Sequence, residues 1–211
     1  MGWNRATGLT SAYPFTGSNT QSGFDFTVHV RRLCEDICSR TPELRHVDMS
    51  AVAICFSQAR KRVRHGLHAS LTPMRFKNGA SSGMRRGRRY SCQQLFDASG
   101  QEMLYILRFY LPRFMDEDFQ RKLGTVFHEL WHIGPDFDGD LRRHQGRCYI
   151  HTHSEVAYNA HMQQLAAEWL DRGPPESTYH FLKRNFDQLE REHKRVVGVR
   201  IPQPKLIPLD P

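Results

Sequence analysis

The sequence predicts a single α+β domain in which a small mixed sheet packs against several helices. Three observations support this fold class. Segments with helical spacing of apolar residues occur before and after a block of short, partly β-branched apolar runs. In addition, 39% of the 211 residues are hydrophobic and 25% are charged, which is typical of a folded domain with one buried core.

We place the domain at residues 23–195, between two segments of different composition. Residues 1–22 are rich in Gly, Ser, Thr and Asn and lack periodicity, so we expect a flexible leader. Residues 196–211 contain several prolines, which favour an extended tail. One hypothesis is that this tail occupies a substrate groove and restrains activity.

The sheet is predicted from three apolar runs. Residues 47–56 suit a buried strand, and residues 90–96 and 103–111 flank Asp97-Ala98-Ser99-Gly100, which is typical of a hairpin turn. Pro112 ends the last of these runs because it cannot donate to a ladder. We therefore expect at least three strands, the last two of which pair as a hairpin.

Four helices are predicted around the sheet. The first covers 24–40, because Phe26, Val30, Leu33 and Ile37 recur at helical spacing before Thr41-Pro42. The second begins at Asp116, a good N-cap residue, and runs to about Ile133. The third runs from about Ser154 to the Gly173-Pro174-Pro175 break, and the fourth covers 177–195.

The chain is basic, with a net charge of +8 and an isoelectric point near 9.5. Much of this charge lies in a basic region at 60–89, where Arg85-Arg86-Gly87-Arg88-Arg89 resembles an electrostatic footprint for nucleic acid. A solvated surface loop is the competing interpretation. No apolar stretch reaches the roughly 20 residues of a membrane span, so we expect no membrane contact. The sequence does not predict an oligomeric state.

The cysteines point to a reducing compartment. Five are present, at positions 34, 38, 55, 92 and 148, and no signal-peptide segment is recognised at the start of the chain. An odd number of cysteines fits a cytoplasmic protein, and we expect Cys34 and Cys38 to be small buried hydrophobic residues rather than metal ligands.

The residues that indicate chemistry are His128-Glu129-Leu130-Trp131-His132. Two histidines four residues apart project from one face of a helix and can bind the same ion. Zinc in hydrolytic sites takes three protein ligands and a water whose pKa falls toward about 7. Glu129 would then act as general base, so the sequence predicts a Zn²⁺-dependent hydrolase acting on a protein or peptide substrate.

The helix around the motif separates two faces. The apolar residues Phe119, Leu123, Val126, Phe127 and Leu130 form one stripe, and the two histidines lie away from it. Gly124 lies one turn before His128 and would leave room for substrate. The competing interpretation is an amphipathic helix whose polar face carries two histidines and a glutamate by chance.

The segment from Thr125 to Ile133, the strand before it and the histidines after it resemble a minimal HExxH zincin metallopeptidase. The nearest likeness is to the phage-type, SprT-like and WLM-like metallopeptidases, whose compact cores pair a small sheet with two helices. The likeness covers about 24–172, and only the HExxH signature is specific. It implies a zincin-like fold, a zinc cofactor and hydrolysis of peptide bonds.

The third zinc ligand is expected in the segment after the motif. The resemblance implies a histidine immediately before the next helix, where His151 stands. Glu155 is the main rival, because gluzincin-type enzymes take a glutamate from that helix. It would lie on the core-facing side with Tyr158, Met162, Leu165 and Trp169. His153 and His144 also remain open.

Further groups are expected to support the site. The acids Asp136, Asp138 and Asp140 would hold histidine N–H groups or pair with Arg142, Arg143 and Arg147. Tyr149 or Tyr158 would donate to the oxyanion, unless each is a core aromatic residue. The alternative function is a nucleic-acid-associated zinc protein whose metal site is structural.

Overall fold

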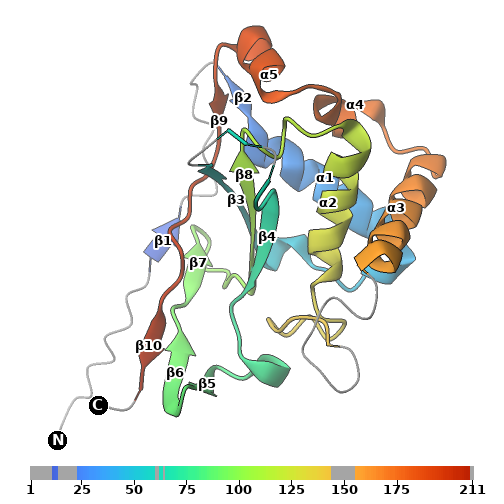
Figure 1. The fold of residues 1–211 in the computed structure, drawn as a ribbon. Coiled ribbons are helices and arrows are strands. Elements are labelled where there is room, and N and C mark those ends of the chain that lie inside the picture. Colours follow the sequence, from blue (N-terminus) through green and yellow to red (C-terminus); the bar gives the residue numbers. More distant parts are fainter. Residues whose placement is uncertain (1–10, 14–22, 60–61, 64, 144–154, 210–211) are drawn as a thin grey trace, which may run out of the picture.

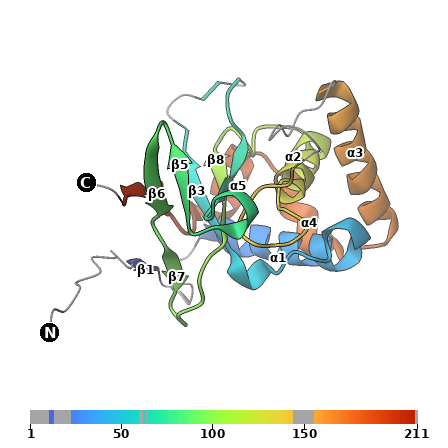
Figure 2. The same cartoon turned by 90° about the horizontal axis from the view of Figure 1, so that it is seen from below.

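The computed structural model describes residues 11–13, 23–59, 62–63, 65–143 and 155–209. It is an α+β fold, as predicted. Helices lie on one side of a central sheet, and two smaller strand groups with the C-terminal segment lie on the other side (Figures 1 and 2). No helix among these residues is long and apolar enough to cross a membrane.

The central sheet contains β3 (Val52–Gln58), β8 (Tyr105–Leu111) and β4 (Ala69–Pro73), in the order β3-β8-β4. β8 pairs with β3 in parallel and with β4 in antiparallel orientation, so the sheet is mixed, as predicted. Alternation along β8 places Leu107 and Phe109 in the helical core, while Ile106 faces the second cluster with Ile201.

The predicted hairpin between residues 90–96 and 103–111 is confirmed only next to its turn, where Phe96 and Glu102 form an antiparallel bridge. The turn itself forms, because Gly100 donates to the carbonyl of Asp97 at 3.1 Å. However, β7 (Leu95–Asp97) pairs in parallel with β1 (Ser11–Tyr13), and β8 takes its partners from β3 and β4. A strand with buried residues on both faces suits the centre of a sheet, and the polar run Gln93-Gln94 is a poor neighbour for it.

The first three predicted helices are present with small changes at their ends. They are α1 (Phe26–Arg40), α2 (Phe119–Trp131) and α3 (Glu155–Asp171). The predicted N-cap of α2 is wrong by two residues: the carboxylate of Asp118 accepts from the Arg121 amide at 2.9 Å. Asp116 instead pairs with Arg62, also at 2.9 Å.

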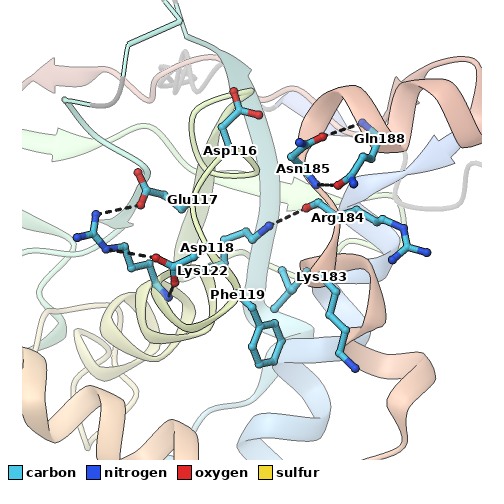
Figure 3. Close-up of a pocket in the computed structure, with 11 residues that line it drawn as sticks. Asp116, Glu117, Asp118, Phe119, Lys122, Lys183, Arg184, Asn185 and Gln188 are labelled. Carbon is cyan, nitrogen blue, oxygen red and sulfur yellow. Dashed lines mark hydrogen bonds and ion pairs between the residues drawn. The ribbon is translucent and has the colours of Figure 1, made fainter.

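The predicted helix over 177–195 is interrupted. It consists of α4 (Glu176–Tyr179), a 3₁₀ turn (His180–Lys183) and α5 (Phe186–His193), with Arg184 extended between them. Asn185 and Gln188 form a capping box that starts a new helix, as Figure 3 shows. The carbonyl of Arg184 accepts from the buried ammonium of Lys122 on α2 at 2.6 Å, which stabilises the break.

The C-terminal segment is extended, as predicted, and lies along the strands. β9 (Val196–Val197) pairs with β2 (Phe24–Asp25). Further on, β10 (Leu206–Pro208) joins β6 (Arg88–Cys92) and β5 (Ser82–Arg85) in a three-stranded sheet.

The leader contributes β1, while residues 1–10 and 14–22 lie outside the described part of the chain. Cys34, Cys38 and Cys55 are free and buried, as expected of small apolar residues, whereas Cys92 is half-buried. Cys148 falls outside the described residues.

Candidate metal centre

Helix α2 brings His128 and His132 together, as their spacing predicts. His132 follows the last helical residue but keeps a right-handed helical backbone (φ −68°, ψ −16°), so its side chain stays on the same face. The two ring centroids lie 4.5 Å apart with the ring planes at 82°. Imidazoles at this separation are close enough for both to bind one ion.

The opposite face of α2 anchors the helix in the core. Leu123, Val126, Phe127 and Leu130 are fully buried, and Phe119 is half-buried against them. The predicted separation of a core face from a histidine face is therefore confirmed. Because apolar packing fixes the helix, the positions of the two histidines follow from the hydrophobic core.

Glu129 lies between α2 and the edge strand β4 and is only 7% exposed. Burial raises the pKa of its carboxyl from 4.5 to about 7, although a hydrogen bond with the backbone of Leu71 on β4 acts in the opposite direction. A carboxyl group with a pKa near neutrality takes up and releases a proton readily at physiological pH.

Tyr158 on α3 packs against both histidines. Its ring centroid is 4.9 Å from that of His128, and its ring stacks on His132 at 21° and 6.2 Å. The Tyr158 hydroxyl lies 3.4 Å from Nδ1 of His132. Burial, and secondarily the charge of Glu129, raise the pKa of Tyr158, so its hydroxyl stays protonated and able to donate.

Arg142 holds the C-terminal end of α2, next to His132. Its backbone amide donates to the carbonyl of His132 at 2.8 Å, and its Nε donates to the carbonyl of Trp131 at 2.7 Å. The guanidinium also lies 4.2 Å from the centre of the Trp131 ring. These contacts satisfy carbonyls that a helix end leaves without partners, and they fix the turn that carries His132.

The acidic loop after α2 closes on itself. Asp140 pairs with Arg143 through two bonds of 2.7 and 2.8 Å, which confirms one predicted acid–arginine pairing. Arg142 was expected to pair with these acids but binds helix carbonyls instead. The hydroxyl of Tyr105 donates to the carbonyl of Asp140 at 2.8 Å, which connects the loop to the central sheet.

A cleft of about 660 Å³ opens beside Glu129 and His128, between the start of β4, α2 and α3. His68 and Glu117 both line it and are in contact, with 3.1 Å between Nε2 and Oε1. The described tail residues, 196–209, do not line this cleft, so the structure gives no support to the hypothesis that the tail occupies the groove. The lining residues are Gly66, Leu67, His68, Ala69, Glu117, Arg121, Gly124, Thr125, His128, Glu129, Asn159, Met162 and Gln163.

Gly124 lines the cleft, as expected, but the space beside it holds the side chain of Gln163 and is not open for substrate. A Cβ at this position would collide with the side-chain amide of Gln163 on α3. Glycine therefore also lets the end of that exposed side chain lie close to α2.

The sequence prediction missed strand β4, whose first residue, Ala69, lines the cleft together with residues 66–68 and whose Leu71 supplies the backbone contact to Glu129. Its residues lie inside the basic region 60–89, for which only a positively charged surface was predicted. The alternation of Ala69, Leu71 and Pro73 with Ser70 and Thr72 is a strand signal of period two that would have identified it.

The candidates for a third ligand are not placed. His144, His151 and His153 lie outside the described residues, as does Tyr149. Glu155 begins α3, without a described side chain. Met162, Leu165 and Trp169, which were predicted to share the core-facing side of α3 with Glu155, are buried, as expected. Within the described part of the chain, no group of three His, Cys, Asp or Glu side chains is arranged to hold a metal.

Comparisons with protein-family models, curated proteins and solved structures give no significant match. The case for a function therefore rests on the residues and geometry described above.

Proposed function

We propose that the protein is a zinc-dependent metallopeptidase of the zincin-like type. His128 and His132 would hold the metal, together with a third ligand from the segment 144–155, for which His151 is the first choice. Glu129 would act as general base and then as general acid. The observation that carries this proposal is the pair of adjacent imidazoles on the last turn of α2, with Glu129 beside them at a cleft.

The residues on either side of segment 144–154 support a third ligand from within that segment. Before it, Arg142 bonds to the backbone of His132. After it, Tyr158 packs against His128 within the first turns of α3. Residues 144–154 therefore join two points that both lie beside the imidazoles, and this segment contains three histidines.

The chain supplies the chemistry around such a metal. A zinc ion held by these residues would lower the pKa of its water toward about 7. Glu129 takes a proton at its buried carboxylate and, with a pKa near 7, returns it to the leaving amine. Tyr158 orients His132 through Nδ1, a contact that fixes a ligand ring.

Strand β4 favours a peptide as the substrate. It is the edge strand of the central sheet, and the backbone of Leu71 is directed toward Glu129. An extended peptide can add to an exposed strand edge through main-chain hydrogen bonds, whatever its side chains. This position would place a peptide bond in the cleft next to the catalytic carboxylate.

Metal analysis combined with peptidase assays tests this proposal. Glu129→Gln should retain zinc and abolish cleavage of a denatured protein substrate, whereas His128→Ala and His132→Ala should lose both zinc and cleavage. Single alanine changes at His144, His151, His153 and Glu155 would identify the third ligand. If zinc-loaded wild type and Glu129→Gln are equally inactive, the metal site is structural and the proposal fails.

A further inference from the structure

The β5–β6 hairpin projects from the lower end of the molecule in Figure 1, in a sheet separate from the one beside the cleft. Arg86 and Gly87 form its two-residue turn, with φ of 50° and 77°. Positive φ at both turn positions belongs to the tight hairpin type whose twist matches that of paired strands. At its tip, beyond the pairing of β10 with residues 90–92 of β6, the hairpin is therefore a narrow two-stranded ribbon.

The tip of this hairpin concentrates positive charge. Arg85, Arg86, Arg88 and Arg89 are all exposed. Residues 75–94, which include both strands, contain no Asp or Glu, and neither do residues 196–209, which include the neighbouring strand β10. The concentration of exposed arginines makes the tip of this hairpin an electropositive surface.

Other arginines of the basic region behave differently. Arg62 pairs with Asp116 at 2.9 Å and with Asp187 at 2.8 Å. Arg75 pairs with Glu102 at 2.6 Å. The fold thus pairs these two arginines with acids of the chain itself, whereas the arginines at the tip of the hairpin are exposed to solvent.

The arginines occupy both faces of the ribbon. Arg85 and Arg88 are cross-strand partners, as are Met84 and Arg89 one position further from the turn. Successive residues of a strand point to opposite faces, so these two pairs lie on different sides. Met84 is 67% exposed, so the second face also presents an apolar side chain beside a cation.

We propose that the β5–β6 hairpin binds duplex DNA by entering a groove. A two-stranded ribbon fits the major groove, which is about 12 Å wide, and phosphates line both walls of that groove. Arginine forks bind phosphate oxygens in a bidentate manner, so cations on both faces of the ribbon meet both walls. An anionic membrane or an acidic protein surface would contact one face and leave the other in water.

Binding would be measured by fluorescence anisotropy with a labelled DNA duplex of about two helical turns, at several salt concentrations. The test variant combines Arg85→Gln, Arg86→Asn and Arg88→Gln. Asparagine is chosen at position 86 because it tolerates a positive φ, so the turn is preserved. The matched control, Arg32→Gln with Arg45→Gln and Arg191→Gln, removes the same charge from exposed positions elsewhere.

The hairpin variant should lose affinity by on the order of tenfold or more at low salt. Its slope of log K against log salt should become shallower by about 3, because each phosphate contact contributes roughly 0.9. The control should keep the slope and most of the affinity. Thermal unfolding of both variants should match that of the wild type, since the altered side chains are exposed.

Several results would overturn the proposal. These are no DNA binding by the wild type, an equal loss in the control, equal competition by single-stranded DNA, or binding of phosphatidylserine vesicles in place of DNA. Glu129→Gln should bind DNA as the wild type does. This arm separates a failure of the peptidase proposal from a failure of the DNA proposal.

Discussion

Lys122 gives a quantitative test of the fold around α2. Its side chain is 2% exposed, and its ammonium donates to the carbonyls of Met115 at 3.0 Å and Arg184 at 2.6 Å. Figure 3 shows the second bond joining α2 to the break before α5. Burial lowers the pKa of Lys122 from 10.5 to about 8, although the acids at 116–118 act in the opposite direction.

This shift predicts how stability depends on pH. Lys122 loses its proton at a lower pH in the folded state than in the unfolded state. Below pH 8, keeping it protonated in the fold therefore lowers the free energy of unfolding by about 3 kcal/mol. The penalty disappears as the pH rises from 8 to 10.5, because in that range the unfolded chain binds more protons. Between about pH 7 and about pH 9.5, Lys122 should therefore add about 2 kcal/mol to the free energy of unfolding.

Urea unfolding of the wild type and Lys122→Met at these two pH values measures the effect, in the presence of a chelator so that metal binding does not contribute. Loss of the two hydrogen bonds lowers the variant's stability by a similar amount at both pH values. The difference in unfolding free energy between wild type and variant should grow by about 2 kcal/mol at the higher pH. Lys183→Met, at an exposed position of the same pocket, should show no such growth. A difference for Lys122→Met that does not change with pH would refute the reasoning.

Three further substitutions test the site and its helix. Asp118→Ala removes the N-cap of α2 and should lower the free energy of unfolding by about 1 kcal/mol in a denaturant titration. Gly124→Ala should leave stability unchanged or raise it by up to about 1 kcal/mol, since the exposed side chain of Gln163 can move, but slower peptide cleavage is expected in the narrowed cleft. Tyr158→Phe removes the hydroxyl near His132 and should weaken zinc binding by about tenfold in a chelator competition; unchanged affinity would exclude an orienting role.

Local patterns in the sequence predicted most of the helical structure. The apolar stripe and the two histidines of α2 follow from a single period of 3.6 residues, which one segment can display by itself. The break at Arg184 also had a local signal, since Asn185 and Gln188 have the spacing of a capping box. A helical interpretation of the whole segment 177–195 overlooked that signal.

The sheet was predicted less well because strand pairing is not local. The partner of β8 was assigned to the adjacent run across a turn, whereas its actual partners, β3 and the unrecognised β4, both lie well before that run in the sequence. Nothing within residues 103–111 specifies which strand lies beside them. For the same reason the wall of the cleft that residues 66–69 form could not be inferred from the HExxH motif alone.

The packing of α2 has a consequence for how the proposed zinc ion would be acquired. Four apolar side chains of this helix are fully buried, so its place in the fold needs no ion, in contrast to small domains that collapse when zinc is removed. Chelation should therefore yield a folded apoprotein, which could be refilled after synthesis and exchanged with cobalt as a spectroscopic reporter. Zinc supply in the cell would then determine how much of the protein is active, without changing how much of it is folded.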